Sequence, residues 1–178
     1  MSALKSLATV WLSGCTGCHM SLLDCDETLL ALPGKARIVY SPLADIKVFP
    51  ENVDITLVEG AVATDADAAL LHRVRKHTET LVAFGDCAVS GNITAMRNGL
   101  PNTAVLSRGY GAVGLEMGTV PEDGIPVLNE TVLPVHRLVD VDVFLPSCPP
   151  SPAMICYVLD ELLAGRTPQL NREQMRHG

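Results

Sequence analysis

Short apolar runs that alternate with helically spaced segments are the strongest constraint on how this 178-residue chain folds. These runs are residues 7–12, 36–40, 54–60, 80–87 and 141–148. They are rich in β-branched residues and bounded by turn residues, which favours buried parallel strands over helices. Strands that alternate with helices predict an α/β fold. Right-handed crossovers would then build residues 1–178 into one flavodoxin-like domain, a three-layer sandwich with a central parallel sheet in the order 2-1-3-4-5.

Three segments are predicted to be helical. Residues 20–32 place Met20, Leu23 and Leu30 at helical spacing before a Pro–Gly pair. Residues 65–78 are expected to form a second helix with one buried face, made of Ala66, Ala69, Leu70 and Val74. The last helix is predicted to begin after Ser151 as its N-cap, with a proline in its first turn, and to stop at Gly165.

Residues 99–135 differ from the rest of the chain, because glycines and prolines recur there and periodicity is weak. A long segment of this kind is uncommon in a compact domain and is usually functional or disordered. We interpret it as an irregular excursion that docks a partner.

Composition excludes several classes of partner. The formal net charge is −7 and no basic run occurs, which argues against nucleic acid and against an anionic membrane. No apolar run approaches the ~20 residues that a membrane-spanning helix needs, so no membrane insertion is expected. The N-terminus has the pattern of a buried strand and not of a signal peptide, which predicts a cytoplasmic protein. Structural disulfides are rare there, so the six cysteines point to metal binding.

The cysteines are placed where the predicted strands end. Cys15 and Cys18 follow the first strand, Cys87 ends the fourth and Cys148 ends the fifth. Because the carboxyl ends of parallel strands share one edge of a sheet, these four thiols are expected to converge there.

Cys25 and Cys156 are expected to lie apart from the other four. In a helix over residues 18–32, Cys25 would lie about 10 Å along the axis from Cys18. Cys156 falls inside the last predicted helix. Both are interpreted as buried, inert thiols.

Four convergent thiolates suit a [4Fe–4S] cluster or a structural zinc ion. Zinc sites usually use two close cysteine pairs, and here only Cys15 and Cys18 form such a pair. A cube-shaped cluster is wide enough for one pair and two distant cysteines. The run Cys15–His19 also matches a c-type haem attachment sequence, and Cys15–Cys18 a redox dithiol, but both interpretations leave Cys87 and Cys148 unexplained.

Four ordered motifs, "GCTGCHMSLLD", "LVEGAV", "FGDCAVSGNITAMRN" and "LPSCPPSP", closely resemble the small subunit of [NiFe] hydrogenases. The similarity runs from about residue 7 to 165 and is greatest to the cytoplasmic, bidirectional, NAD-linked group. The resemblance implies that Cys15, Cys18, Cys87 and Cys148 hold one proximal [4Fe–4S] cluster.

By the same resemblance, the chain is an electron relay within a hydrogen dehydrogenase and is inactive toward H2 alone. The nickel–iron centre would lie in a large subunit. Flavin and NAD would lie in diaphorase subunits that also carry iron–sulfur clusters. With only two spare cysteines the chain would hold no second cluster, so its electrons would leave to another polypeptide.

Glu59 ends the third predicted strand at the same edge as the cysteines. The resemblance places this acid beside the proximal cluster, whereas the alternative is a carboxylate that caps a helix or accepts backbone N–H groups. Asp86 is interpreted as structural.

Two other functions fit parts of the pattern. The quinone-adjacent iron–sulfur subunit of a complex I-like enzyme has two adjacent cysteines after its first strand, unlike Cys15 and Cys18. A module with structural zinc is the other alternative.

Overall fold

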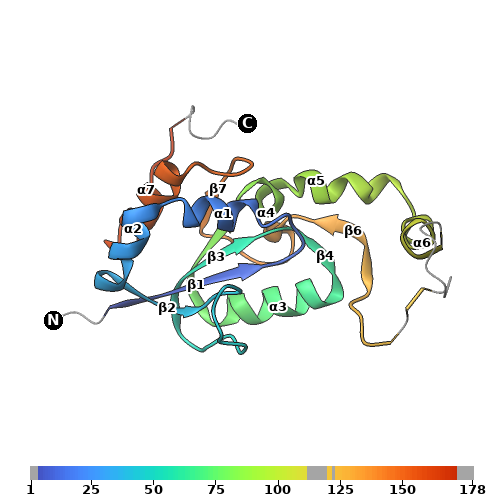
Figure 1. Ribbon diagram of the computed structural model, residues 1–178, viewed down its shortest axis with the longest axis horizontal. Helices are drawn as coiled ribbons and strands as arrows, with labels where there is room; N and C mark the ends of the chain where they lie inside the picture. The colour runs from blue at the N-terminus through green and yellow to red at the C-terminus, as the bar shows by residue number, and fades with distance from the viewer. Residues whose placement is uncertain (1–3, 112–119, 122, 172–178) are drawn as a thin grey trace.

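The computed structural model describes residues 4–111, 120–121 and 123–171. Within them, five parallel strands form one sheet in the order β2-β1-β3-β5-β7 (Figure 1). The strands are β1 (Lys5–Trp11), β2 (Ala36–Tyr40), β3 (Val53–Glu59), β5 (Thr78–Phe84) and β7 (Val143–Leu145). Numbered along the chain, this is the order 2-1-3-4-5. The predicted fold class and strand order are confirmed.

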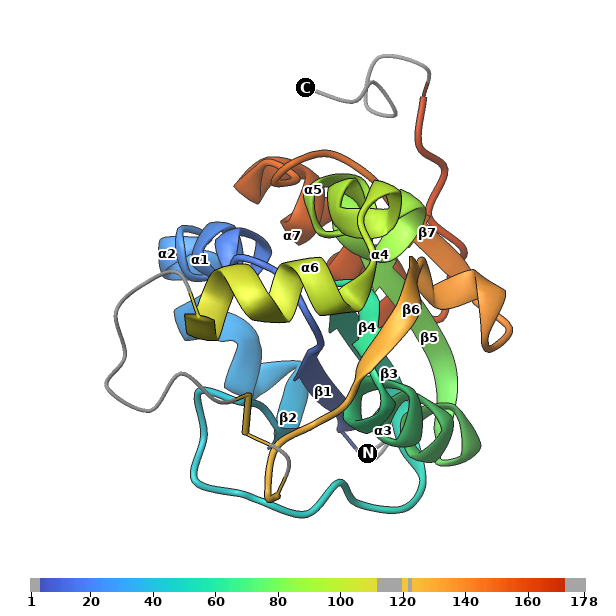
Figure 2. The same ribbon diagram turned by 90° about the vertical axis from the view of Figure 1, so that its right-hand side faces the viewer.

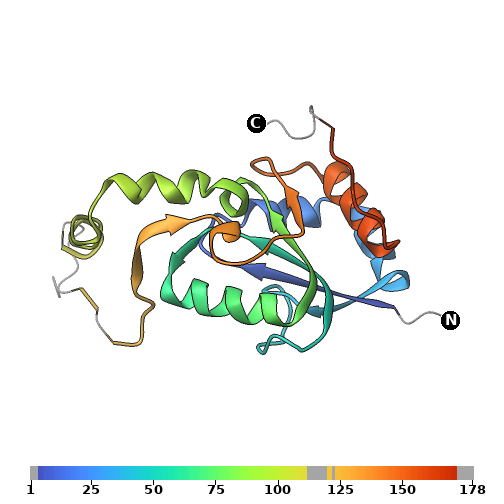
Figure 3. The same ribbon diagram turned by 180° about the vertical axis from the view of Figure 1, so that it is seen from behind.

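Helices cover both faces of the sheet and complete the three layers. The α-helices are α1 (Gly17–Leu23), α2 (Asp26–Ala31), α3 (Asp65–Lys76), α4 (Asp86–Ser90), α5 (Asn92–Ala95), α6 (Asn102–Leu106) and α7 (Pro152–Leu163). Shorter turns are η1 (Leu32–Gly34), η2 (Met96–Gly99), η3 (Ser107–Gly111) and η4 (Val135–Arg137). Helices α1, α2 and α7 lie on one face, and α3 lies on the other (Figures 1 and 3).

The core is divided by the sheet into two apolar clusters. Leu57 belongs to the cluster beneath α1, α2 and α7, and its neighbour Val58 belongs to the cluster beneath α3. This is the alternation expected of a strand buried on both faces. Both side chains are fully buried because β3 lies between β1 and β5 in the middle of the sheet.

The sequence prediction missed a small antiparallel pair, β4 (Val62–Thr64) with β6 (Leu128–Leu133). Side-chain amides extend this pair. Asn98 Nδ2 donates to the carbonyl of Val132 at 3.0 Å, and the amide of Val132 donates to Asn98 Oδ1 at 2.8 Å. Asn98 therefore pairs with the strand as another strand would.

The segment predicted to be irregular, 99–135, contains more regular structure than expected. Its described part includes α6, η3 and β6, while residues 112–119 and 122 lie outside the described residues. Figure 2 shows α6 and β6 side by side in the foreground, and Figure 1 places α6 at the end of the long axis opposite α2. The segment projects away from the parallel sheet.

The single helix predicted over 20–32 is wrong, because the chain turns at Asp24 and Cys25 and divides it into α1 and α2. Its predicted buried face is also wrong: Met20 is 52% exposed and Leu30 is 81% exposed. The buried face instead includes polar residues with internal partners. One is Ser21, whose hydroxyl donates to the carbonyl of Pro150 at 2.6 Å.

The other two helices lie close to their predicted bounds. Helix α3 begins after Thr64, which forms a capping box with Asp67. It buries Leu71 and Val74, whereas Ala66 and Ala69, predicted to be inside, are not buried.

Helix α7 begins as predicted after Ser151, whose Oγ accepts the amide of Met154 at 3.3 Å. It ends at Leu163, before the predicted stop. Among the described residues, every helix is too short or too polar to span a lipid bilayer.

Two leucine truncations test the assignment of inside and outside. Leu57→Ala should lower the free energy of unfolding by about 3 kcal/mol, because it removes a buried side chain and leaves a cavity. Leu30→Ala should change it by less than about 0.5 kcal/mol, because that side chain is exposed in α2. Denaturant unfolding of the purified chain measures both. A comparable loss of unfolding free energy for Leu30→Ala would show that Leu30 is buried, as the predicted single helix over 20–32 requires.

Candidate functional site

The register of the parallel sheet aligns four strand ends at one edge. Trp11 pairs with Glu59, Glu59 with Phe84, and Phe84 with Leu145. The chain therefore leaves β1, β3, β5 and β7 at the same level. In open α/β sheets the loops beyond this carboxyl edge form the ligand site.

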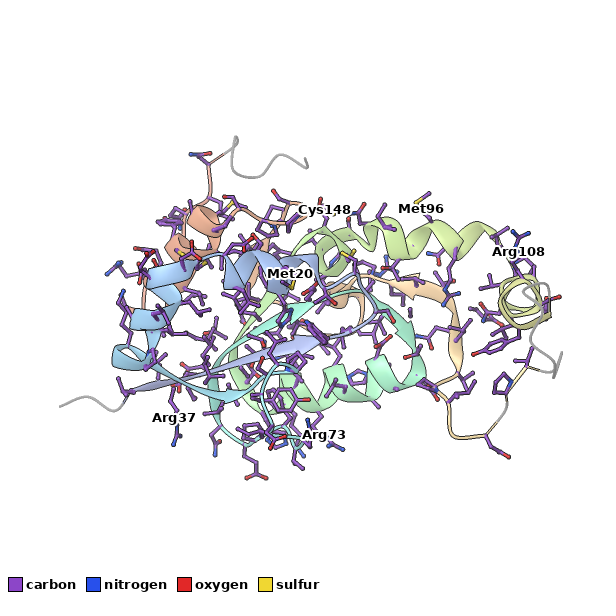
Figure 4. The ribbon with its side chains drawn as sticks, viewed as in Figure 1. Met20, Arg37, Arg73, Met96, Arg108 and Cys148 are labelled. Carbon is purple, nitrogen blue, oxygen red and sulfur yellow. The ribbon has the colours of Figure 1, made fainter. Side chains whose placement is uncertain are left out.

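These loops carry the four cysteines predicted to converge, which we call the edge cysteines: Cys15, Cys18, Cys87 and Cys148. Cys15 lies in the loop after β1, Cys18 in the first turn of α1, Cys87 in α4 and Cys148 in the loop between β7 and α7. Figure 4 shows Cys148 on the outer side of this edge. The strands expected to reach Cys87 and Cys148 are shorter than predicted. The backbone turns at Gly85, with φ of 83°, and at Ser147, with φ of 100°.

Electrostatic contacts link the four thiols to one another. The pKa of the Cys18 thiol is raised well above its ordinary value, first by burial, then by the charge of Glu59 and by the other three edge cysteines. The pKa of the Cys148 thiol is also raised, by burial and then by Cys87, Cys15 and Asp86. These shifts favour neutral thiols. Bound metal would hold them as thiolates and release their protons.

Gly85 creates the space that the Cys18 sulfur occupies. A Cβ atom at Gly85 would lie 2.2 Å from Cys18 Sγ, so only glycine allows the end of β5 to pass this thiol. On the other side, the amide of Gly17 donates to Cys15 Sγ at 3.4 Å. Glycines thus bring backbone against two of the four sulfurs.

Glu59 connects the end of β3 to the first turn of α1. Its carboxylate accepts the amide of Cys18 at 3.3 Å and the amide of His19 at 2.9 Å, and it contacts Nδ1 of the His19 ring. Both side chains are buried. These hydrogen bonds match the structural alternative for Glu59, in which its carboxylate accepts backbone N–H groups.

Asp86 makes the matching connection between the loops of Cys87 and Cys148. Its Oδ1 accepts the amide of Ser147 at 2.7 Å, and its own amide donates to the carbonyl of Ser147 at 3.0 Å. The structural role expected for this buried acid is found, and it holds the loop of Cys148 against α4.

The arrangement of donors fits a group larger than one ion. Within the described part of the chain, no three His, Cys, Asp or Glu side chains are placed around a single metal ion. A four-cysteine zinc site would need its sulfurs within about 2.3 Å of one point. Four thiols that interact with one another match the donor set of a cubane iron–sulfur cluster.

Two polar neighbours of the site were missed from the sequence. His19 entered the sequence analysis only as part of a haem-attachment pattern, yet its ring is fully buried against Glu59, Trp11 and Phe84. Asn92 hydrogen-bonds the Cys148 thiol. Its position five residues after Cys87, where it begins α5, was the one signal that the sequence offered.

Cys25 and Cys156 are not part of this group. They lie between α1–α2 and α7, on the side of the sheet that α7 covers.

Replacing Glu59 tests its role as the tie between β3 and α1. Glu59→Ala should lower the free energy of unfolding by about 3 kcal/mol, because two buried amides and the His19 ring lose their acceptor. Glu51→Ala, at an exposed acid, is the matched control and should have little effect. Equal effects in a denaturant titration would contradict the role given to Glu59.

Replacing Gly85 tests the packing of backbone against sulfur. Gly85→Ala should destabilise the chain by at least about 2 kcal/mol, through a positive φ and a collision with Cys18 Sγ. Gly165→Ala, at a φ of 74° in open space, should cost only about 1 kcal/mol. Adding Cys18→Ala to Gly85→Ala should recover part of the loss. A purely additive double variant would show that the sulfur is not what glycine accommodates.

The chain is similar to proteins of known families and structures. Residues 15–162 match the family described as the 20 Kd subunit of NADH ubiquinone oxidoreductase. The delta subunit of the NAD-reducing hydrogenase HoxS of Cupriavidus necator is 39% identical over 165 residues, which are 90% of this chain and 79% of that protein. A vhu subunit of the F420-non-reducing hydrogenase of Methanocaldococcus jannaschii is 38% identical over 90% of this chain.

The chain spans 57% of the length of the Methanocaldococcus jannaschii relative. A chain in the crystal structure of an NAD+-reducing [NiFe]-hydrogenase in the H2-reduced state is matched over its whole length, with 38% identity and a TM-score of 0.93. A [NiFeSe]-hydrogenase chain from Dm. baculatum, 16% identical with a TM-score of 0.58, shares the fold alone. The chain therefore belongs to the 20 Kd subunit family of NADH ubiquinone oxidoreductase, and subunits of hydrogenases are among the relatives that it resembles over most of its length.

Proposed function

We propose that this chain is the electron-relay small subunit of an NAD-reducing [NiFe] hydrogenase. The observation that carries the proposal is the meeting of four thiols, far apart in sequence, beyond the carboxyl edge of one parallel sheet. The relatives support it, because an NAD-reducing hydrogenase subunit is similar to this chain over 90% of its length.

The edge cysteines are proposed to hold one [4Fe–4S] cluster, which takes up and releases single electrons when it is bound. The protein holds the ligands in place from beneath: Glu59 fixes the turn of Cys18, and Asp86 joins the loops of Cys87 and Cys148. Trp11 and Phe84 place apolar rings around His19, which keeps water from the inner side of the site. Burial and N–H donation to sulfur are the means by which such a site sets its redox potential.

The rest of the reaction is assigned to partner chains. The large subunit is proposed to carry the nickel–iron centre that splits H2, so no residue of this chain is given a catalytic role. Diaphorase subunits with iron–sulfur clusters, flavin and bound NAD are proposed to receive the electrons. The complex is proposed to work in the cytoplasm, where the free cysteines of this chain stay reduced.

The excursion 99–135 is proposed to dock one of these partners. Apolar side chains are exposed along and beside its described part: Ile93, Met96, Leu100 and Val127. Figure 4 shows Cys148, Met96 and Arg108 in this order along the long axis, so the segment extends outward from the site. Exposed apolar residues that gather beside a redox site are typical of a surface covered by a partner.

A second candidate is the quinone-adjacent iron–sulfur subunit of a complex I-like enzyme. The description of the matched family favours it. The separation of Cys15 from Cys18 and the hydrogenase relatives favour the first candidate. Hydrogen-dependent reduction of NAD by the intact assembly distinguishes the two.

The ligand assignment predicts a specific pattern of iron loss. Anaerobically purified assembly should carry about four irons and as much acid-labile sulfide for this chain's cluster. Cys87→Ser and Cys148→Ser should each remove most of that iron, because serine replaces a thiolate ligand. Cys25→Ser and Cys156→Ser are matched controls that should retain it. Elemental and sulfide analysis, with electron paramagnetic resonance of the reduced protein, measures the outcome.

Two results would overturn the proposal. One zinc per chain without sulfide would replace the relay by a structural zinc module. Loss of the cluster signal in Cys156→Ser but not in Cys148→Ser would place the ligands elsewhere.

A further inference from the structure

The two cysteines outside the site, which the sequence predicted to be buried, inert thiols apart from the edge cysteines, lie close to one another. Cys25 is buried at the turn between α1 and α2, and its thiol donates to the carbonyl of Pro152 at 3.5 Å. Pro152 is the first residue of α7, four residues before Cys156. Residues four apart in a helix share a face, so Cys25 touches the turn directly above Cys156.

Helix geometry brings the second sulfur to the same place. Side chains on a helix lean toward its N-terminus and cover the preceding turn, so the Cys156 thiol reaches toward Pro152. The two thiols interact, because Cys156 helps to raise the pKa of the Cys25 thiol. Both residues line one narrow cleft of about 10 Å³ between α2 and α7. These helices lie side by side in Figures 1 and 3.

We propose that Cys25 and Cys156 are an oxidisable thiol pair that a hydroperoxide converts into a disulfide. Cys156 sulfur attacks the O–O bond, takes one oxygen as a sulfenic acid and releases water or an alcohol. Cys25 sulfur then displaces hydroxide from that sulfur, and the hydroxide leaves as water with the Cys25 proton. Two thiols thus lose two hydrogens, and one hydroperoxide is reduced.

The surroundings of the two thiols give the order of these steps. Burial, followed by the interaction with Cys156, raises the pKa of the Cys25 thiol to about 12, so it is protonated at neutral pH and reacts slowly with external oxidants. Cys156 is half-buried and is the thiol that an oxidant meets first. Cys25 then attacks the sulfenic acid at Cys156 within the protein. The closeness of the two sulfurs compensates for the small fraction of thiolate at Cys25.

The size of the cleft selects the oxidant. By this measure, a volume of about 10 Å³ holds about one water-sized molecule, so a glutathione disulfide does not enter the cleft, whereas a small hydroperoxide can meet the half-buried Cys156 thiol at its edge. The disulfide would tie α7 to the turn between α1 and α2. These segments follow the loops of Cys148 and of Cys15 and Cys18, so the bond would lock two parts of the edge site together. The thiol pair stands independently of the cluster and of the proposed function.

Peptide mapping of the intact assembly tests the proposal. Anaerobic complex is treated with limiting hydrogen peroxide, unfolded with an alkylating agent, and digested without reductant. We expect a peptide that links Cys25 to Cys156, with both thiols lost from the alkylated pool, and no such peptide after treatment with oxidised glutathione. Peroxide that damages the cluster would also release the edge cysteines, so the link is assigned by peptide sequence.

Two variants sharpen the result. Cys25→Ser should leave Cys156 as a sulfenic acid that dimedone traps, whereas Cys156→Ser should leave Cys25 unmodified. The proposal is overturned if peroxide modifies Cys156 in the wild-type assembly without linking it to Cys25. It is also overturned if oxidised glutathione forms the link as readily as peroxide.

Discussion

The parallel register of β1, β3, β5 and β7 is the constraint on which the rest of this structure depends. It places Trp11, Glu59, Phe84 and Leu145 side by side, so that four loops begin at one level. A shift of one strand by one residue would turn its buried side chains to the opposite face and move its cysteine along the edge. The apolar clusters on both faces resist such a shift, because β3 buries Leu57 on one side and Val58 on the other. The packing of the core therefore also fixes the positions of the loops that carry the cysteines.

Two buried carboxylates hold the loops with the cysteines in fixed positions relative to the aligned strand ends. A buried carboxylate is costly unless its oxygens are hydrogen-bonded, and backbone amides meet this need. Glu59 accepts two amides of the α1 turn, while Asp86 accepts the amide of Ser147. Each acid joins a cysteine-bearing segment to its neighbour, and Glu59 does so with a histidine beneath it. A carboxylate suits this role because it accepts several amides at once and fixes their directions.

The two groups of cysteines experience different environments on one side of the molecule. The edge cysteines lie beyond the strand ends, two of them exposed, and interact with one another. Cys25 and Cys156 line one narrow cleft, where the Cys25 thiol donates to the carbonyl of Pro152 in α7. Four interacting thiols are the donor set of the proposed cluster, whereas two thiols in one cleft are the pair proposed to form a disulfide. The fold thus gives the same residue type two different environments.

The sequence by itself determined the fold class and the edge at which the cysteines lie, because these follow from alternating apolar runs and from the rules of parallel sheets. The strand order was predicted correctly, although these rules allow other orders. Local signals also sufficed for the start of α7, since Ser151 and Pro152 act within one turn. Only the tertiary structure decided which face of α1 is buried, because Ser21 and His19 find acceptors in Pro150 and Glu59, which are distant in the chain. It also decided that β5 ends at Phe84, since Gly85 must make room for Cys18, and that Cys25 meets Cys156. The spacing of apolar residues along the chain shows which face of a helix or strand is apolar on average. It does not show which distant residues supply hydrogen-bond partners, because these residues meet only when the chain has folded.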